Sequence, residues 1–459
     1  MAFKSIWARI ARSTPLSFKR RTRSSAVDGA IPTRLASALL EIAPSRYMTA
    51  NICRSMASNE RRIQTSLVQQ NIFGIYQHLC RKALSFLSQP AHVFKRICYA
   101  CRRSLKYVEA LSMRVAIHGM GRIGRALARQ ILQSADNAFE LVAVNDLAAA
   151  TQIVHLLQFD SVHGRFEKAM TLHEDGESPW IKCASHTIRC LSEKDVHNLP
   201  WRDLAIDLVF DCTGVCHSAN DASPHLAAGA KRILLSYPTY HATDPTIIYG
   251  FNHDTIPPEA PIVSAASCTS NCVVPVLDVL HREFGVQSAH STTIHAAMND
   301  QSVTDSYANN LRQARAASAS LIPVDTALAR GVIRFFPHLQ GKYAAAAVRI
   351  PTLNVSAIDL KVFVSRKVTQ TRLLEVLASA CQTQYRTIIH MTQQPLVSID
   401  FLQDTHSVIV DATQTQIFDA GRQLRLLLWF DNEWAYACRM LDVARYWNTI
   451  TTTMEQGYD

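Results

Sequence analysis

The chain has 459 residues, of which 48% are hydrophobic, and it carries a formal net charge of +10. This length allows more than one hydrophobic core, because single domains usually stop growing at about 250 residues. Residues 1–112 hold 19 of the 47 basic and 4 of the 37 acidic residues, so the rest of the chain holds 28 basic and 33 acidic residues. That rest is mildly acidic, and the net charge alone does not indicate a protein that binds nucleic acid or a membrane surface.

The N-terminal segment, residues 1–112, is rich in Arg and Ser, poor in acidic residues and without sustained periodicity. This composition predicts a poorly ordered extension. Three hypotheses remain open for it: an organelle transit peptide, a basic tail that binds polyanions, and upstream sequence translated from a start placed too early. The last is favoured because Met113 stands directly before the first predicted strand.

The twelve cysteines argue for a reducing compartment. Four lie in the extension and eight beyond it, without the spacings of a disulfide framework or a paired zinc site. Cys98 and Cys101 form a lone C-x-x-C, and without a second pair of ligands we expect no metal there. No run of about 18 apolar residues indicates a membrane-spanning helix. We predict a cytoplasmic protein, or an organellar one if the extension is a transit segment.

A dinucleotide-binding unit is predicted from Arg114 onward. The segment RVAIHGMGRIGRALARQIL reads as a short apolar strand, a glycine turn and a helix. Gly119, Gly121 and Gly124 form G-x-G-x-x-G, in which the glycines permit a tight turn, close approach of a pyrophosphate and close helix packing. The N–H groups and the positive dipole end of the new helix would stabilise phosphate charge.

An acidic residue in the expected place strengthens this prediction. The apolar strand LVAVND ends in Asp146, which follows Gly124 at the distance of a ribose-binding carboxylate and favours NAD over NADP. The alternative is an ordinary glycine-rich turn followed by an exposed carboxylate. Further strands in DLVFDCTG and KRILLS, separated by a helix-like segment, predict a doubly wound parallel sheet.

Cys268 lies at a predicted junction between a strand and a helix. IVSAA reads as a buried strand, and TSNCVVPVLDVLHREF has apolar residues along one helical face. A helix N-terminus stabilises thiolate over thiol, so we expect a nucleophile near neutral pH. Cys272 lies inside the helix and lacks that advantage.

A candidate base follows in STTIHAAMNDQ, where His295 ends an apolar, β-branched run. Its imidazole could accept the thiol proton and later the proton of a hemithioacetal hydroxyl. Taken alone, each residue is more often structural. Joined to a nucleotide-binding fold, Cys268 and His295 predict aldehyde oxidation by thiolate addition, hydride loss to a nicotinamide and thioester cleavage.

From Met113 to the C-terminus the chain resembles the phosphorylating glyceraldehyde-3-phosphate dehydrogenase superfamily. The resemblance is carried by GxGRIGR, VAVND, DCTGV, SCTSNC, TTIHA, RAAS, VRIPTLNVSAIDL and DNEWAY. Within the superfamily, HAAMNDQSVTDSY and SLIPVDTALA resemble the erythrose-4-phosphate dehydrogenases more closely than the glycolytic enzymes. The resemblance implies NAD as cofactor, a small phosphorylated aldose as substrate and a homotetramer.

The resemblance also implies roles for particular residues. Cys268 is the nucleophile and His295 the base, and Asn432 holds the nicotinamide carboxamide. The cofactor-binding residues that it implies are Gly119, Gly121, Arg122, Ile123, Gly124, Asp146, Thr213, Gly214, Ser236 and Asn432. The substrate- and anion-binding residues that it implies are Ser267, Thr269, Asp300, Thr326 and Arg349, with Arg349 on the terminal phosphate in the same pocket as Asp300. The structural alternatives are a surface cation for Arg349 and a helix N-cap for Asn432.

Departures from the glycolytic pattern favour the erythrose assignment. Met298 stands in place of a threonine, and Val324-Asp325-Thr326-Ala327 in place of T-T-T-G. An anion about 4 Å from Asp325 would meet repulsion of about 1 to 4 kcal/mol, depending on screening. Gln313 stands where the family offers an arginine to the attacking phosphate. We therefore predict that water cleaves the thioester and releases 4-phospho-erythronate.

Other departures concern the cofactor side. His118 stands where the family usually has asparagine, Met120 where it has phenylalanine, and Ala266 where it has asparagine two residues before the nucleophile. None of them removes the core chemistry, and each could alter cofactor affinity.

The predicted fold class is α/β, with three parts. They are the basic extension 1–112, a Rossmann-type NAD-binding domain 113–267 joined by a C-terminal helix 432–459, and an α+β catalytic domain 268–431 with a mixed or antiparallel sheet. The predicted function is NAD-dependent oxidation of D-erythrose 4-phosphate, a supply step for pyridoxal 5′-phosphate synthesis by family analogy. The alternatives are phosphorylating glyceraldehyde-3-phosphate oxidation and a noncatalytic nucleotide- or nucleic-acid-binding protein that uses the extension.

Overall fold

The computed structural model describes residues 112–176, 178–239 and 241–455. The predictions for the extension, including the pair Cys98 and Cys101, lie outside these residues apart from Ser112. Within the described ranges, no helix has the length and apolar character needed to cross a membrane.

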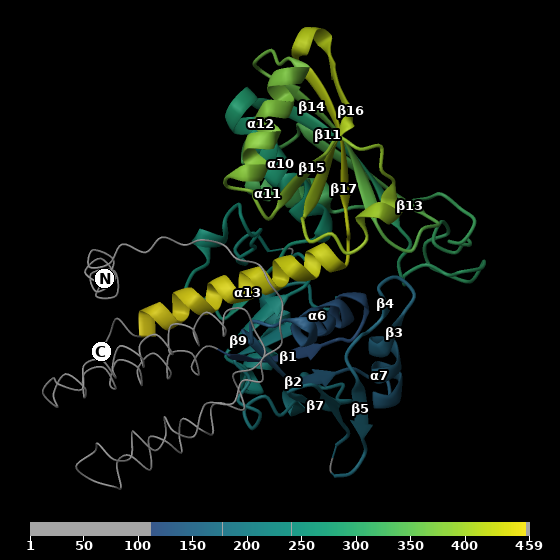
Figure 1. Cartoon of the computed structure of the whole chain (residues 1–459), viewed down its shortest axis with the longest axis vertical. Coiled ribbons are helices and arrows are strands. Elements are labelled where there is room, and N and C mark those ends of the chain that lie inside the picture. The colour runs from purple at the N-terminus through teal and green to yellow at the C-terminus, as the bar shows by residue number, and fades with distance from the viewer. Residues whose placement is uncertain (1–111, 177, 240, 456–459) are drawn as a thin grey trace, which may run out of the picture. The chain divides into compact units, whose positions relative to one another are not determined.

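The first sheet has eight strands in the order β10-β9-β8-β1-β2-β7-β6-β5 (Figure 1). The strands from β10 to β7 pair in parallel, and β6 and β5 extend the sheet with antiparallel pairing. The bounds are β1 Met113–His118, β2 Phe139–Asn145, β5 Met170–His173, β6 Trp180–Cys183, β7 His186–Leu191, β8 Leu208–Asp211, β9 Arg232–Leu235 and β10 Ile262–Ser264. The prediction of a Rossmann-type parallel sheet is confirmed, with an antiparallel edge that was not predicted.

Apolar side chains of β1 alternate between the two faces of this sheet, as expected for a strand covered on both sides. Val115 and Ile117 belong to the core cluster that includes helix α6 (Arg122–Gln133), while Ala116 belongs to the cluster on the other face. The other helices of this part are α7 Ala150–Gln158, α8 Ala219–Ala222 and α9 Pro224–Ala227. A two-stranded ribbon consists of β3 Phe159–Asp160 and β4 Gly164–Arg165.

Helix α13 (Trp434–Glu455) lies beside α6 on the first sheet (Figure 1). Its Trp447 is fully buried in the cluster that holds β1 and α6. The predicted helix began at Asn432, whereas the observed one begins at Trp434. The difference has a local cause, because the Asp431 side chain accepts hydrogen bonds from the backbone N–H groups of Glu433 and Trp434 and caps the helix there.

The second sheet is mixed, with seven strands in the order β12-β13-β11-β14-β17-β16-β15. Its strands are β11 Val286–Ala296, β12 Ile322–Val324, β13 Tyr343–Ile350, β14 Ser356–Val364, β15 Ile389–Thr392, β16 Val408–Phe418 and β17 Gln423–Phe430. Helices α10 Cys268–Phe284, α11 Leu328–Phe335 and α12 Gln370–Gln382 bury their apolar sides in one core cluster with this sheet. Short 3-10 turns lie at Val196–Asn198, His253–Thr255, Pro337–Leu339, Ser398–Phe401 and Asp419–Gly421. This architecture confirms the predicted α+β part with a mixed sheet.

Candidate active site

Cys268 is the first residue of α10, a few residues after β10 ends at Ser264. Ser267 precedes the helix in an extended conformation, and its Oγ accepts a hydrogen bond from the backbone N–H of Ser270 at 3.1 Å. The predicted strand-to-helix junction is confirmed. Cys272, one turn later, is fully buried.

Opposing effects act on the pKa of the Cys268 thiol. Burial raises its pKa to about 11, although the Arg349 guanidinium and the backbone N–H of Thr269 act in the opposite direction. Part of the Cys268 surface faces the cavity, whereas the pKa of the fully buried Cys272 is raised further. Desolvation thus acts against the thiolate, and the Arg349 guanidinium and the first backbone N–H groups of α10 act in its favour.

His295 lies at the end of β11 and is almost completely buried. Its Nδ1 is 2.8 Å from the carbonyl oxygen of Ala296, and a carbonyl only accepts, so the ring proton sits on Nδ1. Nε2 is then an acceptor and lies 3.9 Å from Sγ of Cys268. Burial and the nearby Arg349 lower the pKa of His295 to about 4, so the imidazole is neutral and able to take the thiol proton.

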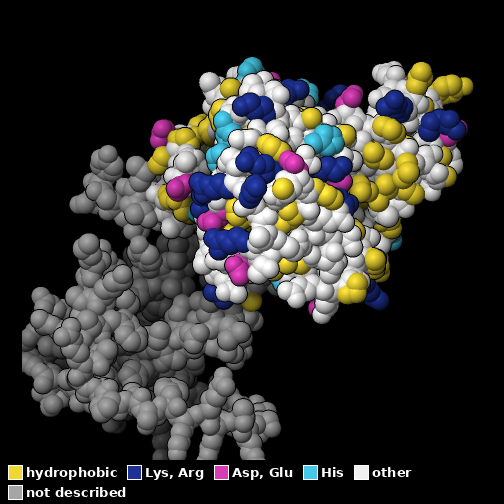
Figure 2. Space-filling view, turned by 90° about the horizontal axis from the view of Figure 1, so that it is seen from above, with side chains coloured by type: hydrophobic (Ala, Val, Ile, Leu, Met, Phe, Trp, Pro, Cys, Tyr) yellow, Lys and Arg dark blue, Asp and Glu magenta, His cyan; other side chains and the backbone are white. Residues whose placement is uncertain are grey.

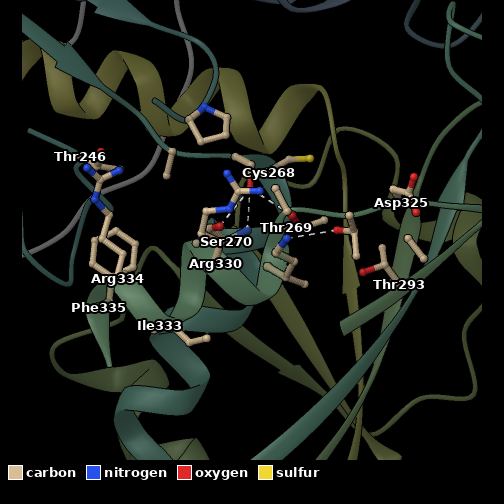
Figure 3. Close-up of a pocket in the computed structure, with 18 of the residues that line it drawn as sticks. Thr246, Cys268, Thr269, Ser270, Thr293, Asp325, Arg330, Ile333, Arg334 and Phe335 are labelled. Atoms are coloured by element: carbon tan, nitrogen blue, oxygen red, sulfur yellow. Dashed lines mark hydrogen bonds between the residues drawn. The ribbon is translucent and has the colours of Figure 1, made fainter. Parts of the chain in front are cut away.

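The thiol, the imidazole and Arg349 line one cavity of about 580 Å³. Figure 3 shows Cys268 in this cavity, with Thr269 and Ser270 of the same helix turn. His295 and Arg349 are register partners on the neighbouring parallel strands β11 and β13, which explains their proximity. Arg349 has a buried Nε without a hydrogen-bond partner. Arg349 is therefore half-buried at the cavity wall rather than fully exposed, and its role in binding an anion stays a prediction.

The predicted anion-binding residues divide into two groups. Ser267, Thr269 and Thr326 line the same cavity as Cys268. Asp300 does not line it and lies exposed beyond the end of β11. Burial lowers the pKa of Arg349, and the negative charge of Asp300 acts in the opposite direction. The cavity wall also contains Met298 and Asp325, which are among the departures from the glycolytic pattern.

Helix α11 brings two arginines to this cavity that the sequence did not single out, Arg330 and Arg334. The helix approaches α10 closely, because a Cβ on Gly331 would lie 2.9 Å from Oγ of Ser270. Figure 3 shows Arg330 directed toward the first turn of α10, and Arg334 directed toward Thr246. The sequence around Arg330, Leu-Ala-Arg-Gly, matches no motif that predicts a cavity-lining arginine.

The glycine loop has the shape that a dinucleotide needs. Gly119 has a φ of +94°, and a Cβ there would lie 2.9 Å from the backbone of Cys212 and Thr213. A Cβ on Gly124 would lie 2.0 Å from the carbonyl oxygen of Gly119, whereas one on Gly121 would meet open space. The loop is therefore tight on its protein side and open where a pyrophosphate approaches, so the residues present fit NAD.

Asp146 and the Thr213–Gly214 turn lie beside this loop. Asp146 Oδ2 accepts a hydrogen bond from the backbone N–H of Met120 at 2.7 Å, and Asp146 remains partly exposed. The Thr213 hydroxyl donates to the buried Asp211 carboxylate at 2.7 Å, and the backbone N–H of Ser236 donates to the Asp211 carbonyl oxygen.

His118, the departure at the end of β1, has a defined tautomer. The Asn145 amide donates to His118 Nδ1 at 2.9 Å, and burial lowers the pKa of His118, so the ring is neutral with its proton on Nε2. His118 therefore adds no positive charge beside the cofactor loop at neutral pH.

Arg122 does not offer its side chain to the cofactor. Its guanidinium forms hydrogen-bonded ion pairs with Asp160 and Glu433, and every one of its nitrogens donates to a carboxylate. The prediction that Arg122 binds the cofactor is thus restricted to its backbone at the start of α6. Ile123 is partly buried and packs against the core cluster of the first sheet.

Asn432 is almost completely buried between β17 and α13, and the Ser356 hydroxyl donates to its Oδ1 at 2.8 Å. Because Asp431 caps α13, the alternative role of Asn432 as N-cap is wrong. Its role in holding the nicotinamide carboxamide stays a prediction.

The described residues give no sign of a metal site. Residues 112–176, 178–239 and 241–455 contain no group of three or more His, Cys, Asp or Glu side chains that could hold an ion. The eight cysteines beyond the extension are all free.

Comparison with known families identifies the chain. Residues 113–219 match the family described as glyceraldehyde 3-phosphate dehydrogenase, NAD binding domain, and residues 267–432 match its C-terminal domain. The two matches cover the glycine loop, the reactive pair and Asn432, and they favour an enzyme over a noncatalytic nucleotide-binding protein. The chain therefore belongs to the glyceraldehyde-3-phosphate dehydrogenase family and is an NAD-dependent aldose-phosphate dehydrogenase.

Proposed function

We propose that the protein oxidises D-erythrose 4-phosphate to 4-phospho-D-erythronate through a thioester on Cys268 that water hydrolyses. The observation that carries the proposal is the cavity wall, in which Cys268, the neutral His295 and Arg349 share the space with Asp325.

The reaction begins with a proton transfer between neighbours. Sγ of Cys268 adds to the aldehyde carbon while its proton passes through His295 Nε2 to the aldehyde oxygen, which leaves a hemithioacetal hydroxyl and a neutral imidazole. His295 then accepts the hydroxyl proton as the carbon becomes the carbonyl of a thioester. Water attacks that carbonyl and the C–S bond breaks. The His295 imidazolium returns its proton to the sulfur, and the two protons of the water pass to solvent as the carboxylate forms.

NAD supplies, when bound, the acceptor for the hydride that leaves the same carbon. The residues that would hold it are the backbone of Gly119, Gly121 and Gly124, the Asp146 carboxylate and the Asn432 amide, with Thr213, Gly214 and Ser236 beside the loop. The open space beside Gly121 supports the assignment of this loop to the pyrophosphate of NAD.

The substrate assignment rests on the polar groups of the cavity. Arg349 would bind the terminal phosphate, and Thr269 and Thr326 would hydrogen-bond the oxygens of the sugar. Met298 removes one hydroxyl donor relative to the glycolytic pattern. The Asp325 carboxylate favours sugar hydroxyls, which donate to it, over a second anion.

The choice of water as acceptor is supported by the loop that follows β11. Gln313 is partly exposed, and its side-chain amide donates to Asp300 Oδ2 at 3.3 Å. It lies outside the cavity lining and offers no charge to an attacking phosphate.

One observation favours a second candidate, the phosphorylating oxidation of glyceraldehyde 3-phosphate. Arg330 brings a guanidinium to the cavity beside the first turn of α10 (Figure 3). A cation in that place could bind inorganic phosphate near the thioester.

A single set of assays separates the candidates. NADH formation is measured with each aldehyde, with and without inorganic phosphate, for the unaltered protein and for Arg330→Gln. We expect D-erythrose 4-phosphate to be the better substrate and its rate to be independent of phosphate in both proteins. A strong phosphate requirement that Arg330→Gln weakens would reject hydrolysis.

We also propose a homotetramer in the cytoplasm that supplies pyridoxal 5′-phosphate synthesis. The family is typically oligomeric, and exposed apolar side chains gather on the segment after β11, where Figure 2 shows them on a protruding lobe. Its members are Met298, Val303, Tyr307, Leu311 and Leu321. A role in nucleic-acid binding, confined to the extension, stays a prediction.

A further inference from the structure

We propose that Ser356 is a positioning residue that fixes the amide of Asn432 and links it to the strand that carries His295. The inference rests on the proposed role of Asn432 as the group that reads the nicotinamide carboxamide. Ser356 is the first residue of β14 and is fully buried.

The sheet register brings the three segments together. Residues 294 and 357 are partners in the antiparallel pair of β11 and β14, so Ser356 lies beside the end of β11. Ser356 is also the partner of Phe430 at the end of β17, and Asn432 follows two residues later. One buried hydroxyl thus lies between the strand end that carries the imidazole and the segment that carries the amide.

The hydrogen bonds of Ser356 show on which side its hydroxyl accepts and on which side it donates. The backbone N–H of Ala296 donates to Ser356 Oγ at 3.1 Å, and Ser356 Oγ donates its own proton to Asn432 Oδ1 at 2.8 Å. Because an N–H group can only donate, the hydroxyl accepts on the side of Ala296 and is free to donate on the side of Asn432. The oxygen of the amide is thereby held against the protein.

The consequence concerns the other half of the amide. With Oδ1 held by Ser356, Asn432 presents Nδ2 as a donor and therefore selects a carbonyl oxygen on its ligand. Without Ser356, the amide could turn and present either atom. Since Ala296 follows His295 directly, the same hydroxyl also keeps the nicotinamide-binding amide in register with the imidazole.

The chain offers a matched control for this hydroxyl. Ser291 is another fully buried serine of the same sheet, and it accepts a hydrogen bond from the Tyr343 hydroxyl at 2.9 Å. Ser291→Ala makes the same chemical change as Ser356→Ala, and the hydrogen bond that it removes joins Ser291 to Tyr343, not to Asn432.

The test is a double-mutant cycle read out as the Kd for NAD, measured by calorimetry without substrate. We expect Ser356→Ala to weaken binding by about five- to tenfold, the size of one neutral hydrogen bond, and Ser291→Ala to leave it unchanged. If Ser356 acts through Asn432, then Ser356→Ala has no further effect in the Asn432→Ala background. A structural role in the sheet would instead give the same fold-loss in both backgrounds.

The results distinguish a failure of this inference from a failure of the proposed role of Asn432. Equal losses in both backgrounds, or an unchanged Kd in Ser356→Ala, would overturn the inference. If Asn432→Ala itself leaves the Kd unchanged, the proposed cofactor role of Asn432 fails instead. Thermal unfolding of each variant without NAD identifies a protein that has lost its fold.

Discussion

At the residue scale, the reactive pair depends on a third side chain. Arg349 lowers the pKa of both Cys268 and His295, because its positive charge favours a thiolate and disfavours an imidazolium. The guanidinium thus helps the sulfur to lose its proton and keeps the imidazole neutral, which is the state that can accept it. Binding of a phosphate to Arg349 would weaken both effects.

The first prediction concerns Arg349→Gln. Loss of the guanidinium raises the pKa of the Cys268 thiol, because the positive charge that counteracts the effect of burial is then absent. We expect alkylation of Cys268 by iodoacetamide at pH 8 to slow by about tenfold, the effect of one pKa unit. The rate is followed by mass spectrometry of the peptide that contains Cys268. The exposed Arg366→Gln serves as control, and equal rates in the two variants would contradict this electrostatic account.

Ala266 carries local strain two residues before the nucleophile. Its φ is +60°, in the left-handed region that favours glycine and asparagine over alanine, and it is almost completely buried. We predict that Ala266→Gly raises the free energy of unfolding by about 0.5 to 1 kcal/mol, measured by urea unfolding. The neighbouring Ala265, whose φ is not positive, is the control, and Ala265→Gly should destabilise. A loss of stability in Ala266→Gly would show that the left-handed backbone costs little there.

Single residues were predicted where a local pattern marks them. Cys268 and His295 each end or begin an element, and the sequence shows both positions. The raised pKa of Cys268 was not predictable, since it depends on a cavity built from segments distant in the chain. Ser356 and Arg330 were missed for the same reason, because only strand register and helix packing bring them to the site.

At the element scale, a buried ionic cluster joins the start of α6 to the start of α13. Arg122 pairs with Asp160 and Glu433, and His163 Nε2 lies 2.9 Å from Glu433 Oε2. Glu433 follows Asn432 directly. The cluster therefore holds the glycine loop and the amide-bearing segment in one arrangement.

The prediction is that Glu433→Gln lowers the free energy of unfolding at pH 7 by about 2 to 4 kcal/mol, because it leaves the partly buried Arg122 guanidinium with one of its two carboxylate partners. The pKa of Glu433 is lowered by Arg122 and His163 despite burial, so its contribution is present above the carboxyl's ordinary pKa and is lost as pH falls through the lowered one. Urea unfolding at pH 7 and at acidic pH measures both effects. Glu283→Gln, in an exposed pair with Arg372, should cost less than about 1 kcal/mol. Equal losses in the two variants would contradict the account.

Elements with a local signature were predicted well. The strand, turn and helix from Arg114 onward follow from a change of apolar period at the glycines. The order of strands in the second sheet was not predictable, because it joins β11 to β13 and β14, which lie far along the chain. The start of α13 was misplaced by two residues, since the Asp431 cap decides it.

At the scale of the whole molecule, the two sheets meet at the reactive cysteine. The first sheet ends in β10, and α10 then begins the second part, so Cys268 contacts the core clusters of both parts. Motifs in the sequence predict a nucleotide-binding part before the cysteine and a second part after it, and the order of the two sheets along the chain agrees with this.

The exposed apolar segment after β11 predicts an assembly. In the described chain, Tyr307 and Leu311 are 108% and 82% exposed, which is costly for a monomer in water. We expect sedimentation to show a tetramer for the unaltered protein and a smaller species for Leu311→Asp. Phe418→Asp, on an exposed side chain of β16, should leave the mass unchanged. A monomeric unaltered protein would refute the proposed assembly.

The most direct test of covalent catalysis is the mass of the protein quenched in acid during turnover with NAD and D-erythrose 4-phosphate. The account predicts a transient phospho-erythronyl group on the peptide that contains Cys268, and neither this group nor NADH formation in Cys268→Ser. Sustained NADH formation by Cys268→Ser, or an acyl group on Cys272 instead, would contradict it.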